Sequence, residues 1–311
     1  MTNAFVERES CPGCGFHQSK MIYSVGLLDE PVVRFFFRKL TKHSMLPLFE
    51  GTKYELQKCS ACGLIYQHYV LTDEFTELLY DDWLINCDAE PELSRVHIQT
   101  DRAIYYANEL VGLARFFEKP TREITILDYG AGIGWWCRMA AALGFDVYGT
   151  DISMERVENL MSGGISTVPY GNLPRQQFDF INTEQVFEHL ARPREVINRL
   201  ADALKPGGIL KVSVPQGRRL ERRLKGMDWT APRGSRHFLG SATPLIHINT
   251  FTYNSIVAMG EAAGFVPAVV PLPKWYSIVN LTSLKAMSKS LALPIFRRLD
   301  KSTYVFLKLQ R

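Results

Sequence analysis

Long hydrophobic runs are missing from this 311-residue sequence. No stretch reaches the roughly 18 uncharged apolar residues that a membrane-spanning helix requires, so no membrane span is expected. The first ten residues, MTNAFVERES, also lack the order of a charged segment followed by an apolar one that secretory signals have. We therefore expect a cytoplasmic protein.

A strong excess of one charge is also absent. The chain has 36 lysines and arginines against 32 aspartates and glutamates, a net charge of +4. This excess is too small to require a nucleic acid or an anionic membrane as partner. Hydrophobic residues make up 46% of the chain, which is enough for one large core and a small satellite domain.

Cysteine is scarce, with six in the whole chain, and a reducing compartment disfavours disulfides between them. Four of the six form two CxxC pairs, CPGC at 11–14 and CSAC at 59–62. Such pairs can place four thiolates around a tetrahedral zinc and leave no coordination position open, so the sequence predicts a structural zinc site. The predicted ligands are Cys11, Cys14, Cys59 and Cys62. The remaining Cys87 and Cys137 are expected to be small buried side chains.

The chain divides into two predicted parts. Residues 1–85 read as a zinc-ribbon-like module, with VVRFFFRKL forming a helix or hairpin insertion between the CxxC pairs. In residues 86–311, a helical pattern near 90–118 precedes strand-like runs such as ITILDYG, FDVYGTD, FDFINT and GILKVSVP. These alternate with helical stretches at 134–143, 153–162 and 186–203, and a long basic loop precedes a helix near 252–263. The alternation predicts a parallel α/β sheet with helices on both faces.

The segment ILDYGAGIG, residues 126–134, places glycines after a strand, where a cofactor can approach a bare backbone. Gly130, Gly132 and Gly134 give G-x-G-x-G rather than the G-x-G-x-x-G of dinucleotide folds. Asp128, beside this loop, would repel a pyrophosphate and favour a cationic ligand. Asp151 ends the next strand, where a carboxylate can accept both ribose hydroxyls. Together these residues favour S-adenosylmethionine over NAD.

Four segments in order, ILDYGAGIG, VYGTDIS, FDFINTEQVFEHL and ALKPGGILKVSVP, resemble the motifs of class I S-adenosylmethionine-dependent methyltransferases. The resemblance covers roughly residues 90–311. It implies a Rossmann-like sheet of seven strands whose last strand is antiparallel, with STYVFLKL as the candidate for that strand. It also implies that the glycine loop and Asp128 lie along the methionine portion of the cofactor, and that Asp151 holds the ribose. Ile152, Asn172 and Leu173 would then lie against the adenine.

A cysteine-rich module followed by YDDW and these motifs is similar to bacterial methyltransferases that modify sugars or other small metabolites. The predicted acceptor is therefore a small molecule, most plausibly a sugar or a nucleotide sugar. The basic run RRLERRLKG, residues 218–226, is compatible with a phosphate-bearing acceptor, because guanidinium groups pair with phosphate. Its alternative interpretation is a solvated surface.

The acceptor side offers three candidate catalytic residues. Glu188 and His189 follow the fourth strand in EQVFEHL, and His247 follows the fifth; His237 is a further histidine of that region. Histidine is the commonest general base. In some members of the wider family a Glu-x-x-Glu-His run with a downstream histidine holds a divalent metal, but here Gln185 replaces the first glutamate. A base, a metal site and a structural role stay open.

Two rival functions also remain open. An RNA methyltransferase could grip nucleic acid with the cysteine module, but acidic residues dilute the basic ones there, and nucleic acid is not the expected partner. A cofactor-bound scaffold could use the same module to recruit a protein. The sequence leaves open the acceptor atom, whether oxygen, nitrogen or carbon, and the oligomeric state.

Overall fold

The computed structural model describes residues 4–30, 32–37, 45–80, 100–215, 217, 220–226, 228–232, 235, 237–270, 283–284, 287–288 and 304–310. The chain forms two compact units. We call residues 1–90, 185–196 and 214–262 the cysteine unit, and residues 91–184, 197–213 and 263–311 the sheet unit. The boundary predicted between residues 85 and 86 lies outside the described residues and stays a prediction. Among the helices in the described ranges, none combines the length and the apolar character needed to cross a bilayer.

The sheet unit contains one seven-stranded sheet with the order β12-β13-β10-β9-β6-β7-β8. Its strands are β6 (Thr125–Tyr129), β7 (Asp146–Thr150), β8 (Ser166–Thr167), β9 (Phe178–Glu184), β10 (Leu204–Ser213), β12 (Phe265–Ala268) and β13 (Tyr304–Leu309). Strands β10, β9, β6, β7 and β8 pair in parallel. Strand β13 is antiparallel to both β10 and β12. The predicted Rossmann-like sheet with STYVFLKL as its antiparallel strand is thus confirmed.

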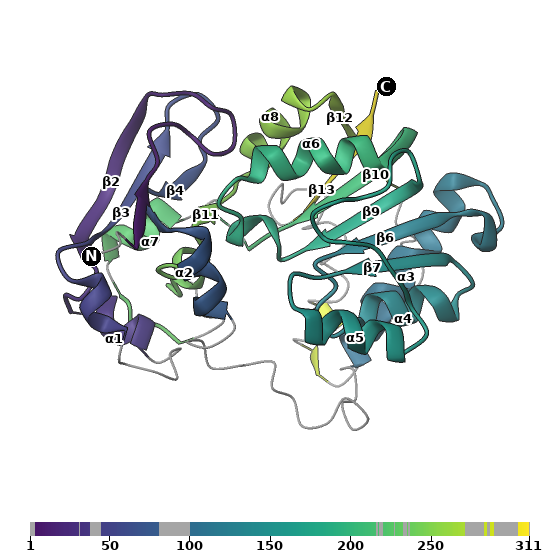
Figure 1. Ribbon diagram of the computed structural model, residues 1–311, viewed down its shortest axis with the longest axis horizontal. Helices are drawn as coiled ribbons and strands as arrows, with labels where there is room; N and C mark the ends of the chain where they lie inside the picture. Colours follow the sequence, from purple (N-terminus) through teal and green to yellow (C-terminus); the bar gives the residue numbers. More distant parts are fainter. Residues whose placement is uncertain are drawn as a thin grey trace. The chain divides into compact units, whose positions relative to one another are not determined.

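Helices α3 (Thr100–Phe117), α4 (Trp135–Ala142) and α5 (Met154–Ser162) cover one face of this sheet, and a short helix η3 (Thr121–Glu123) precedes β6. The opposite face carries α6 (Pro193–Ala203), as Figure 1 shows. Buried apolar residues between the first face and its helices form the main core, among them Leu110, Ile126, Trp136, Leu160 and Phe180. The predicted helices at 134–143 and 153–162 are confirmed by α4 and α5.

The single helix predicted over 186–203 is wrong. The chain instead forms a short 3-10 turn, η4 (Phe187–His189), and begins α6 only at Pro193. Leu190 is extended, with φ −77° and ψ 126°, and so ends the turn. Proline suits the first position of a helix because its missing N–H would have no helical partner there. The apolar residues keep helical spacing on both sides of residues 190–192, and this spacing led to the wrong prediction of one continuous helix. Pro193 is the sequence signal for the start of a separate helix.

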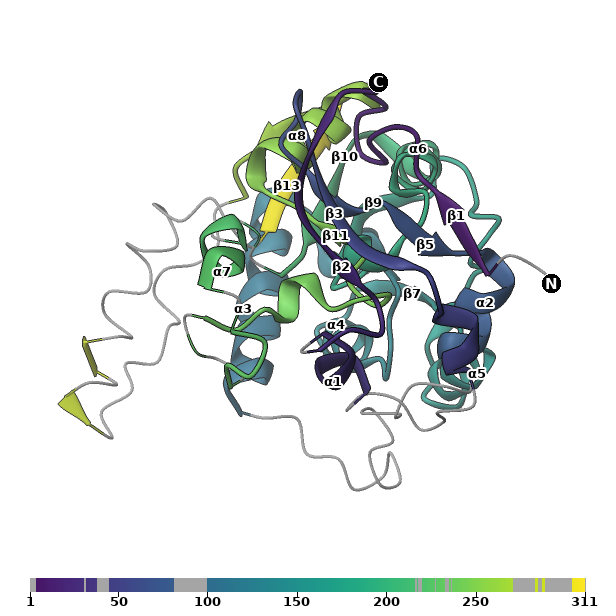
Figure 2. The same ribbon diagram turned by 90° about the vertical axis from the view of Figure 1, so that its left-hand side faces the viewer.

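The cysteine unit contains two antiparallel sheets. Strand β1 (Phe5–Glu7) pairs with β5 (Tyr69–Leu71), side by side in Figure 2. The second sheet has the order β11-β4-β3-β2, formed by β2 (Ser19–Gly26), β3 (Lys53–Cys59), β4 (Ile65–Gln67) and β11 (Asn249–Thr250). Strand β11 comes from the region after β10, so a segment distant in sequence completes the sheet of the cysteine module.

The remaining elements of this unit are α1 (Val32–Phe37), η1 (Leu46–Phe49), α2 (Asp73–Leu78), α7 (Leu220–Gly226), η5 (Gly240–Ala242) and α8 (Tyr253–Ala262). Its core combines residues of the N-terminal module, such as Phe36, Phe49 and Tyr54, with Leu224 and Trp229 from the later segment. VVRFFFRKL was predicted to form a helix or a hairpin, and its described residues, 32–37, form the helix α1. Helix α8 matches the helix predicted near 252–263. The region predicted as a long basic loop is therefore partly helical and contributes to a core.

Candidate cofactor site and metal centre

The glycine loop between β6 and α4 requires glycine at three positions. Gly130, Gly132 and Gly134 have φ values of 79°, 56° and 79°, which side chains rarely adopt. A Cβ on Gly134 would lie 2.5 Å from Leu160 Cδ2, whereas a Cβ on Gly132 would meet no atom within 4 Å. Gly132 therefore borders open space that a ligand can occupy, and Gly134 permits close packing of the loop on α5.

Asp151 fastens this loop to the end of β7. Its Oδ2 accepts a hydrogen bond from the Gly132 amide at 2.8 Å, and its Oδ1 accepts one from the Ser153 amide at 3.1 Å. The guanidinium of Arg156 lies 3.7 Å from Oδ1. The side chain is nearly buried, at 5% exposure. Each carboxylate oxygen has two lone pairs, so capacity to accept from a ligand remains beside the glycine loop.

Asp128, near the end of β6, is only 3% exposed. A residue predicted to contact a ligand was expected to be more accessible. Its Oδ1 accepts from Asn182 Nδ2 at 2.8 Å, and the thiol of Cys137 lies 3.5 Å from Oδ2. Burial raises the pKa of Asp128 to about 7 despite the hydrogen bond from Asn182. Cys137 is fully buried as predicted; Cys87 lies outside the described residues.

The residues predicted to face adenine lie at the surface of the sheet unit. Ile152 follows Asp151 directly and is 61% exposed, and Asn172 is exposed while Leu173 is half-buried. An aromatic pair that sequence reasoning missed accompanies them: the rings of Tyr129 and Tyr170 stack with centroids 4.6 Å apart. Exposed apolar residues near Asp151 are what a planar base needs as a cover.

The sheet unit also contains a buried ionic network that was not predicted from the sequence. The ammonium of Lys211 lies 2.8 Å from the Glu109 carboxylate and 3.3 Å from Glu184 Oε2. The indole of Trp136 donates to Glu109 Oε1 at 3.0 Å. Nothing in the spacing of β10 distinguishes a buried lysine from an outward-facing one, so the sequence carries no signal for this network.

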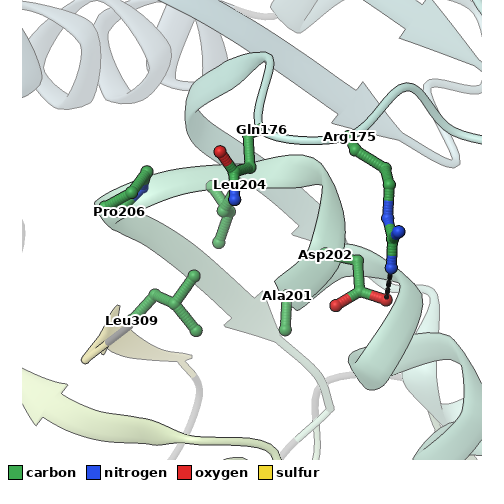
Figure 3. A pocket seen from close by; sticks show the side chains of 7 residues that line it. All are labelled: Arg175, Gln176, Ala201, Asp202, Leu204, Pro206 and Leu309. Carbon is green, nitrogen blue, oxygen red and sulfur yellow. Dashed lines mark hydrogen bonds and ion pairs between the residues drawn. The ribbon is translucent and has the colours of Figure 1, made fainter.

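A cavity of about 430 Å³ lies elsewhere in the sheet unit, at the amino end of β10 (Figure 3). Its lining residues are Arg175, Gln176, Ala201, Asp202, Leu204, Pro206 and Leu309. The glycine loop follows the carboxyl end of β6, and β6, β9 and β10 run parallel, so the cavity is at the opposite edge of the sheet. None of the catalytic, cofactor-binding or metal-binding residues predicted from the sequence lines this cavity.

The four predicted zinc ligands converge in the cysteine unit. The Sγ atoms of Cys11, Cys14, Cys59 and Cys62 all lie within 4.8 Å of one another. Cys11 and Cys62 are 3.6 Å apart and Cys14 and Cys59 are 3.5 Å apart. Zinc–sulfur bonds of about 2.3 Å in a tetrahedron require sulfur atoms about 3.8 Å apart. The donor set and its spacing therefore fit a closed tetrahedral zinc site.

The two loops that carry these cysteines share one backbone pattern. In the first, the Gly15 amide donates to Cys11 O at 2.8 Å; in the second, the Gly63 amide donates to Cys59 O at 3.2 Å. Both glycines have positive φ, 79° and 75°. The glycine after each CxxC pair thus closes the turn that presents both thiols to one point.

Glu188, His189 and His247 form a second cluster in the cysteine unit, whereas the exposed His237 is not part of it. One ligand atom from each of the three lies within 4.8 Å of the others. Nδ1 of His189 is 2.8 Å from the carbonyl of Ile246, and Nδ1 of His247 contacts the carbonyl of Gly240. A carbonyl only accepts, which favours the hydrogen on Nδ1 of each ring, and Nδ1 of His189 also lies 2.9 Å from the hydroxyl of Tyr80. In that tautomer of a neutral ring, Nε2 is the acceptor nitrogen.

Arg8 and Asn249 hold the turn that carries His189. The guanidinium of Arg8 donates to the carbonyls of Leu190 at 3.4 Å and Ala191 at 3.1 Å, and to Asn249 Oδ1 at 2.9 Å. Asn249 Nδ2 donates to the carbonyls of Phe187 at 3.1 Å and Leu190 at 2.7 Å. Burial lowers the pKa of Arg8 to about 10. Residues of β11 and of the segment just before Cys11 therefore fix both ends of η4.

The family model described as a methyltransferase domain matches residues 102–268, more than half of the chain. A ubiquinone biosynthesis O-methyltransferase from Caulobacter vibrioides is 28% identical over 176 residues, which cover 51% of this chain and 67% of that protein. One from Chelativorans sp. is 32% identical over 105 residues, covering 30% of this chain and only 42% of that protein.

Solved structures that resemble the chain include an S-adenosylmethionine dependent methyltransferase from Mesorhizobium loti. It has 16% identity, a TM-score of 0.43, and coverage of 70% of this chain and 100% of that one. Another is the 1,6-didemethyltoxoflavin-N1-methyltransferase from Burkholderia thailandensis, solved with S-adenosylhomocysteine, at 18% identity, a TM-score of 0.41, and coverage of 68% and 80%. The methyltransferase-domain model matches more than half of the chain, and the matched region contains the glycine loop between Asp128 and Asp151. The chain therefore belongs to the methyltransferase-domain family and is a class I S-adenosylmethionine-dependent methyltransferase.

Proposed function

We propose that the protein transfers the methyl group of S-adenosylmethionine to a hydroxyl oxygen of a small-molecule acceptor. The observation that carries this proposal is the cluster of Glu188, His189 and His247, which brings two imidazole rings and a buried carboxylate together, with one ligand atom of each within 4.8 Å of the others. A hydroxyl is a weak nucleophile until its proton is removed, and such a cluster suits that task. The similarity to ubiquinone biosynthesis O-methyltransferases supports transfer to oxygen.

The geometry of the sheet unit supports the cofactor-binding roles that we propose. Asp151 would accept the ribose hydroxyls, and Ile152, Asn172 and Leu173 would cover the adenine. Asp128, Gly130, Gly132 and Gly134 would border the methionine portion. The test is Asp151→Asn, which keeps one acceptor oxygen for the backbone amides but removes the charge. Loss of charged hydrogen bonds costs about 1.5 to 3 kcal/mol each, so calorimetry should show cofactor affinity falling about tenfold to a hundredfold. Unchanged affinity would contradict the ribose assignment.

His189 and His247 are the proposed general base. Each should be replaced by glutamine, whose side-chain amide can donate a hydrogen bond to the carbonyl that Nδ1 now contacts. The correct variant should lower turnover about a hundredfold to ten-thousandfold while leaving the affinity for cofactor unchanged. The acidic limb of the pH–rate profile should disappear with it. If both variants turn over a known acceptor within a few-fold of the wild type, no histidine base operates.

A divalent cation bound by the same three residues is the second candidate, because the ligand atoms already lie within 4.8 Å of one another. Two histidines and one carboxylate leave coordination positions for an acceptor oxygen, whose pKa the metal would lower. Brief EDTA treatment followed by Mg²⁺ or Mn²⁺ separates the two mechanisms. Activity that is lost and then restored, with zinc content unchanged, indicates the metal. Activity that never changes indicates the base.

The acceptor class that we propose is a sugar or a nucleotide sugar. Helix α7 supports a phosphate-bearing acceptor, because Arg222 and Lys225 are exposed on it, although Arg223 is engaged with the carbonyl of Phe238 at 3.2 Å. Methyl-labelled cofactor should be incubated with cell extract before and after nuclease or phosphatase. Label in phosphatase-sensitive small molecules supports the proposal. Label lost to ribonuclease indicates an RNA methyltransferase, and absence of label despite cofactor binding indicates a scaffold.

Zinc is the proposed occupant of the four-cysteine cluster, because four thiolates favour zinc over hard cations. Metal analysis of protein purified without chelator should find one zinc per chain. The Cys59→Ser, Cys62→Ser double variant should contain none, while Cys137→Ala, which removes a thiol of the sheet unit, should keep it. Equal zinc in the double variant and the wild type would place the metal elsewhere.

A further inference from the structure

A fully buried ammonium lies in the sheet unit. Lys211 of β10 has 0% exposure and lies between Glu109 of α3, at 2.8 Å, and Glu184 of β9, at 3.3 Å. Glu109 is itself 1% exposed and also accepts from the indole of Trp136. Replacing a buried ion pair by apolar residues is often neutral or even stabilising, so stability alone does not explain this network.

The network reaches the surface through Glu184. This side chain is 29% exposed, and it belongs to the last residue of β9. Asn182 and Glu184 are two residues apart on one strand and therefore share a face of the sheet. Asn182 is paired in register with Asp128 and donates to its carboxylate. Glu184 is thus on the same face as Asp128 and at the carboxyl ends of the strands, where ligands of α/β sheets bind.

The charges around this edge do not balance. Glu109, Glu184 and Asp128 carry three carboxylates, and among the described residues of this network Lys211 supplies one ammonium. Burial alone would lower the pKa of Lys211, but Glu109, Tyr105 and Glu184 outweigh it and raise the pKa above its ordinary value. Burial raises the pKa of Asp128, and the charge of Glu184 raises it further. The ion pairs place two carboxylates, of Glu109 and Glu184, around one ammonium, and a cationic ligand at this edge would offset the remaining negative charge.

We propose that Glu184 binds a positively charged centre of the cofactor, its sulfonium or its ammonium, and that the Lys211–Glu109 pair positions the Glu184 carboxylate for this contact. The proposal rests on the S-adenosylmethionine dependence of the family. Glu109 is too deeply buried to reach a ligand, whereas Glu184 is both partly exposed and anchored. The net positive charge of S-adenosylmethionine matches the surplus at this edge of the sheet.

Calorimetric titration of the 311-residue chain with S-adenosylmethionine and with S-adenosylhomocysteine tests the contact. The product lacks the sulfonium charge but keeps the ammonium. Glu184→Gln should weaken binding about tenfold. Weakening for S-adenosylmethionine alone identifies the sulfonium, and equal weakening for both ligands identifies the ammonium. Affinities unchanged for both ligands overturn the proposal.

Three further variants serve as controls for the effect of Glu184→Gln on cofactor binding. Glu123→Gln changes net charge equally but lies in the exposed turn before β6, so it should bind both ligands like the wild type. Glu184→Asp keeps the charge and should restore part of the affinity. Lys211→Met combined with Glu109→Met keeps the net charge and removes the anchor, so it should also bind more weakly; wild-type affinity would remove the positioning role. Wild-type protein that binds neither ligand would contradict the family assignment instead.

Discussion

Asp128 couples the stability of the protein to pH in the direction opposite to most aspartates. Burial raises its pKa to about 7 in the folded state, well above the ordinary value of 3.8. The folded protein therefore binds this proton more tightly than the unfolded chain. The stabilisation is fully present below pH 3.8 and is lost as the pH rises through about 7.

Asp128→Asn tests this coupling. The amide can still accept from Asn182 and carries no charge to desolvate, so the variant should lose the pH dependence that the carboxyl contributes. The melting temperature of the wild type should fall between pH 5 and pH 8 by several degrees more than that of the variant, measured without cofactor. Parallel curves for the two proteins would contradict a raised pKa. Binding of the cationic cofactor should be weaker in the variant at pH 8, because the ionised carboxylate is gone.

The location of some individual residues can be predicted from the sequence, and that of others cannot. Asp128 and Asp151 stand at the ends of strands beside glycines, a pattern that by itself predicts that both lie at one edge of a sheet. Lys211 and Glu109 give no such signal, because a lysine in a strand and a glutamate in a helix are ordinary surface residues. Their burial depends on contacts between residues distant in sequence, among them the ion pair that joins Glu109 of α3 to Lys211 of β10.

At the scale of elements, the glycine loop allows a matched comparison. Gly132→Ala and Gly134→Ala impose the same kind of strain, since both positions have positive φ, but only the Cβ at 134 would clash, at 2.5 Å from Leu160. Positive φ costs a non-glycine residue about 1 to 2 kcal/mol. We expect Gly134→Ala to be clearly less stable than Gly132→Ala, and Gly132→Ala to lose cofactor affinity out of proportion to its stability. Thermal melting and calorimetry measure the two effects. Equal stability of both variants would contradict the packing role of Gly134.

The turn η4 depends on Arg8, which is distant from it in sequence. Arg8→Lys should keep the charge but cannot reach the carbonyls of Leu190 and Ala191 and the Asn249 side chain together, because an ammonium lacks the planar fork of a guanidinium. Turnover should fall about tenfold, equivalent to about 1.4 kcal/mol, with cofactor affinity unchanged. Arg34→Lys, at an exposed position of α1, is the control. Steady-state kinetics that match the wild type would show that η4 needs no such support.

Helices and strands could be predicted where the sequence pattern that specifies them lies within the element itself or in the turn beside it. The strands β6, β7, β9 and β10 and the helices α4 and α5 follow from periodicity and from glycine turns. Strand β11 has only two residues, Asn249 and Thr250, and pairs with β4 of the N-terminal module. No local pattern can reveal such a pairing. The helix predicted over 186–203 failed although a local signal was present, because Pro193 and the extended Leu190 divide it.

At the scale of the whole molecule, the cysteine unit is one folded body built from three stretches of chain. The cysteine loops adjoin β3 and β4, β4 pairs with β11, and Arg8 and Asn249 hold η4. Its core also draws Leu224 and Trp229 from the region after β10. The four cysteines and the cluster of Glu188, His189 and His247 therefore belong to the same compact unit, whereas Asp128, Asp151 and the glycine loop belong to the other.

Removal of the zinc that we propose for the four cysteines should separate methyl transfer from cofactor binding. In the Cys59→Ser, Cys62→Ser variant we expect turnover to be lost, because the cysteine unit no longer holds η4 and His247 in place. Cofactor affinity should stay within a few-fold of the wild type, since the cofactor-binding residues that we propose lie in the sheet unit. Limited proteolysis should cut within residues 4–80 and 220–262 and spare β6 to β9. Loss of cofactor binding together with turnover would mean that the two units fold as one, and full turnover without zinc would mean that the histidine cluster does not depend on the metal.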